Sequence, residues 1–213
     1  MNSNRGSIVQ RLRAKGGVRN LVRITMAWAW TRAFSVLYGA WLRAYGVRLE
    51  GRVNFTGRIR ILGDPRRISI GAGSWLHRGV TLWTHDYGPG HGRIVLGRRV
   101  TMLTGVTVNS YESVTVGDDT AFGDGCYVQD NDHGTEPGMP VMRQPQVSAP
   151  IRIGNDVWFG ARCIVLKGVT VGDGTVVGAG SVVVKTLPEG VVAVGVPARA
   201  LKRRGGGALD RAA

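Results

Sequence analysis

The chain holds four histidines, the side chains best suited to move protons at neutral pH: His77, His85, His91 and His133. His133 ends the run Asp-Asn-Asp-His at residues 130–133. A histidine that acts as a base usually has its tautomer fixed by a partner on its other nitrogen, and Asp130, Asn131 and Asp132 are the alternatives nearest in sequence. No close pair of histidines is spaced to supply two zinc ligands, and no Gly-x-Ser-x-Gly motif is present. We therefore expect no metal site and no serine acyl-enzyme.

The elements that must position these residues follow a period of six. Between residues 153 and 184, an apolar residue recurs at every sixth position: Ile153, Phe159, Val165, Val171, Val177 and Val183. A second series of small or β-branched residues lies four positions later, and both cysteines, Cys126 and Cys163, fall on it. A period of six is neither that of a helix nor that of a strand, and it is typical of a parallel β-helix. The sequence predicts an all-β fold in which the two thiols are buried in adjacent coils.

The hexads extend backwards through most of the chain. Residues 51–69 are expected to form an imperfect first coil, and the predicted inward residues of the coils before residue 153 are Ile70, Leu76, Leu82, Leu96, Met102, Val108, Val116, Phe122 and Val128. A proline-bearing insertion covers about 134–150. Insertions project from one edge of a solenoid and often carry function. We therefore predict a β-helix domain at 51–204 with an inserted loop at 134–150, and a flexible tail at 205–213.

Residues 1–50 form a basic extension that contains an expected helix from about residue 18 to 45. Residues 1–49 carry nine Arg or Lys and no Asp or Glu, within a chain of net charge +14. An aromatic stripe repeats at helical spacing: Trp30, Phe34, Tyr38, Trp41 and Tyr45. The helix is expected either to cap the open end of the solenoid or to lie on an anionic membrane surface, and the two are compatible.

The compartment is predicted from what the chain lacks. The apolar stretch of the N-terminal region is internal and no small-residue cleavage site follows it, which is unlike a secretory signal peptide. The expected location is the cytoplasm, with peripheral contact at the inner membrane.

Three features together resemble one family: the hexads, the Asp-Asn-Asp-His-Gly run before the insertion, and the ending Val-Gly-Val-Pro-Ala-Arg. They resemble the hexapeptide-repeat acyltransferases, and within these the sugar O-acetyltransferases of the galactoside, maltose and capsular-polysaccharide type. The resemblance covers about residues 52–204. It implies a left-handed β-helix, which is an exception to right-handed crossovers. It also implies a homotrimer with active sites between subunits and acetyl-CoA as acyl donor.

The resemblance assigns roles to particular residues. His133 matches the catalytic histidine. The asparagine that the galactoside enzymes use elsewhere in the site aligns with residues 103–105 of this chain, so Asn131 is named as the catalytic companion from its closeness to His133 and not from the resemblance. The backbone of Gly160 and Ala161 is expected to face the thioester of acetyl-CoA. Transfer to the acceptor is expected to be direct, with both substrates bound in a ternary complex. The other residues expected to bind CoA are Trp158 beside the cleft, Gly178 and Ala179 along the pantetheine arm, and Lys185, Arg199 and Lys202 at the phosphates.

Counting residue positions along the predicted coils adds candidates for the acceptor pocket. His133 lies five positions after inward Val128, and His85 lies three after inward Leu82, on the same edge two coils lower. Since coils stack about 4.8 Å apart, His85 and Asp86 are expected to line the acceptor pocket together with Asp130.

The predicted activity is transfer of an acetyl group to a hydroxyl of a sugar, polysaccharide or glycolipid precursor. An N-acyltransferase acting on an amino sugar or nucleotide-sugar is one alternative. A non-catalytic basic module that binds membrane or nucleic acid is another. The module explains the N-terminal charge but neither His133 nor the C-terminal motif, so no nucleic acid partner is expected.

Overall fold

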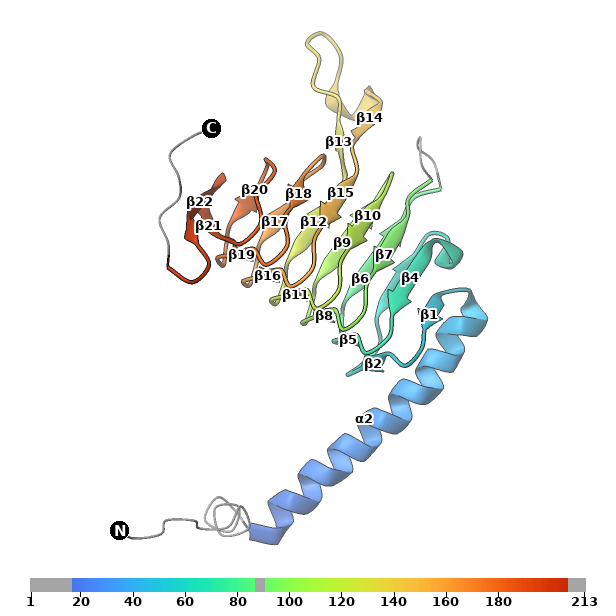
Figure 1. The fold of residues 1–213 in the computed structure, drawn as a ribbon. Coiled ribbons are helices and arrows are strands. Elements are labelled where there is room, and N and C mark those ends of the chain that lie inside the picture. The colour runs from blue at the N-terminus through green and yellow to red at the C-terminus, as the bar shows by residue number, and fades with distance from the viewer. Residues whose placement is uncertain (1–16, 87–90, 207–213) are drawn as a thin grey trace, which may run out of the picture.

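The computed structural model describes residues 17–86 and 91–206, with side chains from residue 23 onward. The start of the predicted basic extension and most of the predicted tail lie outside the described residues. A single long helix, α2 (Gly17–Tyr45), precedes a stack of short strands (Figure 1).

The strands form three parallel sheets, one for each side of a triangular solenoid (Figure 1). Sheet A contains β1 (Arg48–Glu50), β4 (Ile68–Gly71), β7 (Ile94–Leu96), β10 (Val114–Val116), β15 (Ile151–Ile153) and β18 (Thr170–Val171). Sheet B contains β2 (Asn54–Phe55), β5 (Trp75–Leu76), β8 (Thr101–Met102), β11 (Ala121–Phe122), β16 (Trp158–Phe159), β19 (Val176–Val177), β21 (Val191–Gly195) and the antiparallel β22 (Ala198–Arg203). Sheet C contains β3 (Arg60–Leu62), β6 (Thr81–Thr84), β9 (Thr107–Ser110), β12 (Tyr127–Gln129), β17 (Ile164–Val165) and β20 (Val182–Val183).

One strand from each sheet makes a coil, and six complete coils follow one another. The predicted parallel β-helix with an N-terminal helical extension is confirmed. The first coil, β1 to β3, begins at Arg48, somewhat earlier than the imperfect coil expected at 51–69. A short 3₁₀ turn, η1 (Pro65–Arg67), leads from it to coil 2.

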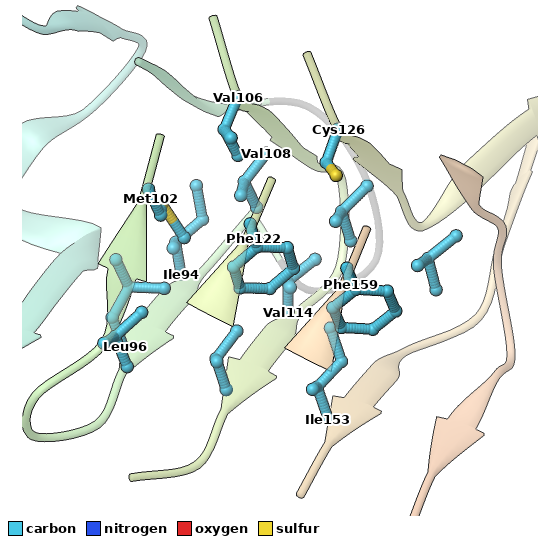
Figure 2. Close-up of a cluster of buried hydrophobic side chains, with 14 of the residues drawn as sticks. Ile94, Leu96, Met102, Val106, Val108, Val114, Phe122, Cys126, Ile153 and Phe159 are labelled. Carbon is cyan, nitrogen blue, oxygen red and sulfur yellow. The ribbon is translucent and has the colours of Figure 1, made fainter. Parts of the chain in front are cut away.

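The core consists of inward side chains stacked coil upon coil. Every predicted inward residue is buried, and the strands pair in the predicted register, as in Val116 with Ile153 and Phe122 with Phe159. Figure 2 shows the rings of Phe122 and Phe159 side by side in neighbouring coils. They stack, with centroids 4.9 Å apart and an interplanar angle of 7°. These apolar columns form one continuous core, and burial of such side chains is the main force that holds a solenoid together.

The two cysteines are free thiols that occupy equivalent corners of coils 4 and 5, as predicted. Cys126 and Cys163 are 1% and 0% exposed. The Cys126 thiol donates to the carbonyl of Gly160 over 3.1 Å. Its contact with Cys163 and its burial raise the pKa of the Cys126 thiol, so it packs as a small neutral side chain.

Helix α2 caps the first coil with its C-terminal half only. Ser35 and Leu42 are buried, and the backbone N–H of Phe55 donates to Ser35 Oγ over 2.8 Å. The aromatic stripe does not form the buried face: Trp30 is 75% exposed and Trp41 is 54% exposed. Instead its last four rings stack along the helix, with centroids 5.2 to 5.6 Å apart.

The N-terminal half of the same helix extends beyond the coils (Figure 1). All side chains from residue 23 to 30 are exposed. Within the described part of the chain, no helix is long and apolar enough to cross a membrane.

The predicted insertion is a hairpin that leaves the solenoid between coils 4 and 5 (Figure 1). Its antiparallel strands are β13 (Asn131–His133) and β14 (Gln146–Ser148), and η2 (Val141–Arg143) lies between them. The hairpin starts from the corner where sheet C gives way to sheet A, because β12 precedes it and β15 follows it.

Candidate active site

His133 lies on β13 at the base of the hairpin, opposite Gln146. Its side chain is partly buried. The Nδ1 atom is buried and has no hydrogen-bond partner among the described residues, and the same is true of Asn131 Oδ1. Asn131 and His133 are two residues apart on one strand, so their side chains share a face. The two atoms left without partners, an acceptor and a potential donor, therefore lie on the same face of β13 but are not hydrogen-bonded to each other.

Asp130 anchors the strand that carries His133. It is fully buried, and it accepts hydrogen bonds from the backbone N–H of Tyr111 (2.6 Å), the backbone N–H of Glu112 (2.9 Å) and Ser110 Oγ (3.1 Å). Burial raises the pKa of Asp130, and these donors oppose that rise. Both carboxylate oxygens of Asp130 therefore accept hydrogen bonds from residues 110–112, at the end of coil 3 and in the turn that follows it.

Asp132 is also engaged, on the other side of the strand. Its carboxylate lies 2.5 Å from Lys167 Nζ, which follows β17 in coil 5. Asn131 Nδ2 donates to Gln146 Oε1 over 2.6 Å, and Ser148 Oγ donates to Glu112 over 2.9 Å. The base of the hairpin is thus tied to coils 3, 4 and 5, and of the three possible partners of His133 only Asn131 keeps an unused buried atom.

His85 is buried at the corner after β6, with 6% of its surface exposed. Its Nε2 lies 2.8 Å from Asn109 Oδ1, and its ring stacks on Trp83 with centroids 4.5 Å apart. Asp86 is exposed, and its carbonyl lies 2.9 Å from His91 Nδ1.

A chain of side-chain hydrogen bonds leads from His85 to the hairpin. Asn109 Nδ2 lies 3.4 Å from Gln129 Oε1, and Gln129 Nε2 donates to the carbonyl of Asn131 over 2.6 Å. Tyr127 also donates to Gln129 Oε1, over 2.5 Å. The structure therefore connects His85 to the strand of His133 across three coils of sheet C.

The residues expected to face the thioester lie at the opposite corner, where sheet B gives way to sheet C. Gly160 and Ala161 follow β16, and Gly178 and Ala179 occupy the same place one coil higher. A Cβ on Gly160 would be 2.5 Å from the Ala179 nitrogen, so tight coil stacking by itself requires this glycine. Gly160 is half-buried and Ala161 is exposed, so a ligand can approach the backbone at this corner. Trp158, on the outer face of sheet B, is 57% exposed.

The three cations expected at the CoA phosphates are exposed. Lys185 follows β20, whereas Arg199 and Lys202 lie on β22. Among the described ion pairs none involves these three side chains. Charges without acidic partners are suited to an anionic ligand. No group of three or more His, Cys, Asp or Glu that could hold a metal ion occurs in the described ranges.

Sequence reasoning missed Lys167, Asn109 and Gln129. The last two occupy outward positions of sheet C, where β-helix periodicity sets no requirement for residue type. The sequence nevertheless holds a signal that could have found them. Both residues directly follow a predicted inward residue and carry an amide, whereas the same position in the later coils is aliphatic, Leu166 and Val184.

Comparison with known proteins identifies the family. Residues 150–185 match the model of the hexapeptide repeat of succinyl-transferase. An Escherichia coli (strain K12) protein described as a lipopolysaccharide biosynthesis O-acetyl transferase, WbbJ, is 35% identical over 143 residues, which cover 63% of this chain and 72% of that protein. The chain belongs to the hexapeptide-repeat acyltransferase family. A Mycobacterium tuberculosis (strain ATCC 25618 / H37Rv) protein described as a probable acetyltransferase is 32% identical over 154 residues, 70% of this chain. The match spans only half the length of that relative.

Solved structures agree with the fold of this acyltransferase family member. A galactoside acetyltransferase in complex with coenzyme A is 25% identical, with a TM-score of 0.50, over 71% of this chain and 64% of that one. The Bacillus cereus N-acyltransferase AntD, in complex with dTDP-4-amino-4,6-dideoxyglucose and coenzyme A, gives a TM-score of 0.68 at 21% identity, over 78% and 88% of the two chains. At that identity the likeness to AntD concerns the fold alone.

Proposed function

We propose that the protein transfers an acetyl group from acetyl-CoA to a hydroxyl of a sugar, polysaccharide or glycolipid precursor, with His133 as general base. The observation that carries the proposal is the pair of buried atoms without partners, His133 Nδ1 and Asn131 Oδ1. An amide oxygen that accepts the Nδ1 proton fixes the tautomer in which Nε2 is basic. Nε2 is not among the buried atoms without partners and makes no hydrogen bond within residues 17–86 and 91–206, so it would be open to an acceptor hydroxyl. Once the two side chains rotate to form this hydrogen bond, Asn131 would orient the base, and Asp130 would hold their strand in place.

The donor would lie along coils 5 and 6. The accessible backbone at Gly160 and Ala161 would accept the thioester end, the corner at Gly178 and Ala179 would follow the pantetheine arm, and Trp158 would flank it. Lys185, Arg199 and Lys202 would meet the phosphates as point charges or as a planar fork. Acetyl-CoA acts here as a substrate, and the acetyl group would pass directly to the acceptor oxygen.

We place the proposed site between two subunits. Lys167 marks the corner beside His133, because it contacts Asp132, and Ala161 marks the opposite corner of the same coil. The six residue-to-residue steps from Ala161 to Lys167 can span up to about 20 Å of sheet C. A base must come within hydrogen-bond distance of its proton. In a trimer, His133 of one subunit would instead face the Gly160–Ala161 corner of the next.

The exposed half of helix α2 is the proposed contact with an anionic membrane surface. Ile24, Met26, Trp28 and Trp30 are 61% to 75% exposed, and Arg23 and Arg32 flank them. Exposed apolar and aromatic side chains with arginines beside them suit the boundary between lipid headgroups and acyl chains, where tryptophan is enriched. A trimer would present three such helices, and each cation near an anionic leaflet contributes about 1 kcal/mol. The protein would then act in the cytoplasm at the inner membrane.

The proposal is tested by following CoA release from acetyl-CoA with sugars, glycolipids and nucleotide-sugars as acceptors. We expect His133→Ala to lower kcat about 10²- to 10⁴-fold without weakening CoA binding, since a general base contributes that much. His77→Ala, in coil 2, is the matched control and should keep full activity. The chemistry of the product distinguishes an ester from an amide, and light scattering should give the mass of three chains. If neither hydroxyl nor amine acceptors release CoA, the non-catalytic basic module becomes the better reading.

A further inference from the structure

Three side chains form a row on the outer face of sheet C. Trp83, Asn109 and Gln129 occupy the same outward position in coils 2, 3 and 4, and the backbone register pairs Trp83 with Asn109 and Asn109 with Gln129. We refer to them as the 83–109–129 row. In coils 5 and 6 the same position holds aliphatic residues, Leu166 and Val184. The change from aliphatic to aromatic and amide side chains is not needed for coil stacking, because these side chains point away from the core.

Trp83 is held in a fixed orientation while remaining open. His85 stacks on one face of the indole, with an interplanar angle of 27°, and the side chain is still 38% exposed. His85 is itself fixed by its hydrogen bond to Asn109 Oδ1. The indole therefore presents a rigid apolar face at low cost in conformational entropy, which is what a flat ligand requires.

The two amides are also fixed and retain bonding capacity. Gln129 Nε2 donates one hydrogen to the carbonyl of Asn131, which leaves its second hydrogen for a ligand. Asn109 is 6% exposed, and among the described residues its Nδ2 makes only long contacts, 3.4 Å, to Tyr127 Oη and Gln129 Oε1. A stronger acceptor could replace either of them. The row thus combines an apolar platform with amide donors in one line.

We propose that the 83–109–129 row binds the sugar chain of the acceptor, which is an oligosaccharide or a glycolipid of at least two rings; this rests on the function proposed above. A pyranose ring has an apolar face that packs on an indole and an edge of hydroxyls that pairs with amides, as in sites that combine apolar lining with a few polar groups. Adjacent strands lie about 4.8 Å apart, so Trp83 and Gln129 are about 10 Å apart. That distance exceeds the length of one ring.

The direction of the bound chain follows from the position of His133. Gln129 is four residues before His133 and bonds to the strand that carries it. The ring that is acetylated would therefore lie beyond Gln129, at the hairpin. The rings that follow it would extend down the coils to Trp83. A monosaccharide would occupy the hairpin end alone and would not reach the indole.

The test compares Trp83→Ala with the wild type on a monosaccharide and on an oligosaccharide acceptor. We expect kcat/KM for the oligosaccharide to fall about 10-fold, since an aromatic contact contributes roughly 1 kcal/mol, with an unchanged value for the monosaccharide and an unchanged KM for acetyl-CoA. Trp75→Ala is a matched control: Trp75 is 40% exposed in the same coil but on sheet B. It should behave as the wild type. Gln129→Leu, which keeps a similar volume, should weaken the oligosaccharide in the same way.

Direct binding separates this inference from the proposed function. Oligosaccharide is titrated calorimetrically into His133→Ala and into the double variant with Trp83→Ala, and binding should weaken about 10-fold in the second. If the wild type transfers acetyl groups but Trp83→Ala treats both acceptors alike, the inference is wrong and the function stands. If Trp83→Ala instead changes the mass measured by light scattering, the row is a contact between subunits and the inference is also wrong.

Discussion

Gly160→Ala tests how tightly the coils are stacked at the proposed thioester corner. An added Cβ would lie 2.5 Å from the nitrogen and 2.8 Å from the Cα of Ala179 in the next coil. Ordinary contacts begin near 3.4 Å, so the two coils must separate by about 1 Å at this corner. The separation strains the hydrogen bonds from Gly160 N to the Val177 carbonyl and from Gly180 N to the Ala161 carbonyl, both 2.8 Å.

The expected loss in free energy of unfolding is about 2–4 kcal/mol. Overpacking of a dense interior costs about 1–3 kcal/mol, and a weakened backbone hydrogen bond costs about 1 kcal/mol. In a chain of this size each kcal/mol lowers Tm by roughly 2–4 °C, so calorimetry should show a decrease of about 5–15 °C. Titration with CoA should show weaker binding as well, since the same backbone is proposed to face the donor.

Two control variants separate stability from binding. At Gly117 an added Cβ would lie 2.6 Å from Asn155 Oδ1 and 2.7 Å from the Gly154 carbonyl carbon, at the corner between sheets A and B. Gly117→Ala should lower Tm similarly and leave CoA binding intact. Gly39→Ala, in helix α2, meets no atom closer than 3.6 Å and should raise stability by up to about 1 kcal/mol. A wild-type Tm in Gly160→Ala, or equal loss of CoA binding in Gly117→Ala, would refute the reasoning.

Two further predictions concern charge. If Arg199 and Lys202 meet the phosphates of the donor, the wild type should prefer acetyl-CoA to its dephospho form. Arg199→Ala or Lys202→Ala should raise KM for acetyl-CoA and reduce that preference. An unchanged ratio of KM for acetyl-CoA to KM for the dephospho form would contradict the assignment. More protein should sediment with anionic vesicles than with neutral ones, and this fraction should fall as salt rises because the contact is partly electrostatic. The double variant Trp28→Ala, Trp30→Ala should lower the fraction that sediments with anionic vesicles. Equal sedimentation with both vesicle types would leave α2 as a cap only.

The core could be predicted from the sequence because every sixth side chain must enter a triangular interior that accepts only apolar residues. Phe122 and Phe159 were aligned by counting alone, and they stack in the structure. The position of the hairpin could be predicted because a proline-bearing segment interrupts the six-residue repeat. The partners of its polar residues could not be found by counting. The sequence predicts Asp130 in the acceptor pocket, whereas in the structure its carboxylate is buried against the backbone N–H groups of residues 111 and 112.

The docking face of helix α2 was predicted only in part. A stripe of aromatic residues suggested the buried side, but large rings keep a helix away from its neighbour. The face that packs on coil 1 carries Ser35, Gly39 and Leu42, all buried. Small side chains let the helix approach closely: a Cβ on Gly39 would already lie 3.6 Å from Leu49 Cδ1. Phe34 and Tyr38 pack at the edge of the contact, and the other rings remain outside.

The order of the proposed sites along the solenoid constrains the acceptor. Helix α2 meets coil 1, the 83–109–129 row covers coils 2 to 4, the hairpin with His133 follows coil 4, and the proposed donor residues begin in coil 5. A lipid-linked sugar would have its lipid near the membrane, at the end where α2 projects. Its chain would then run up the row, so that the ring presented to His133 is the one farthest from the lipid. Enzyme products should therefore carry the acetyl group at the non-reducing end, and an acetyl group found next to the lipid would require the chain to lie in the opposite direction.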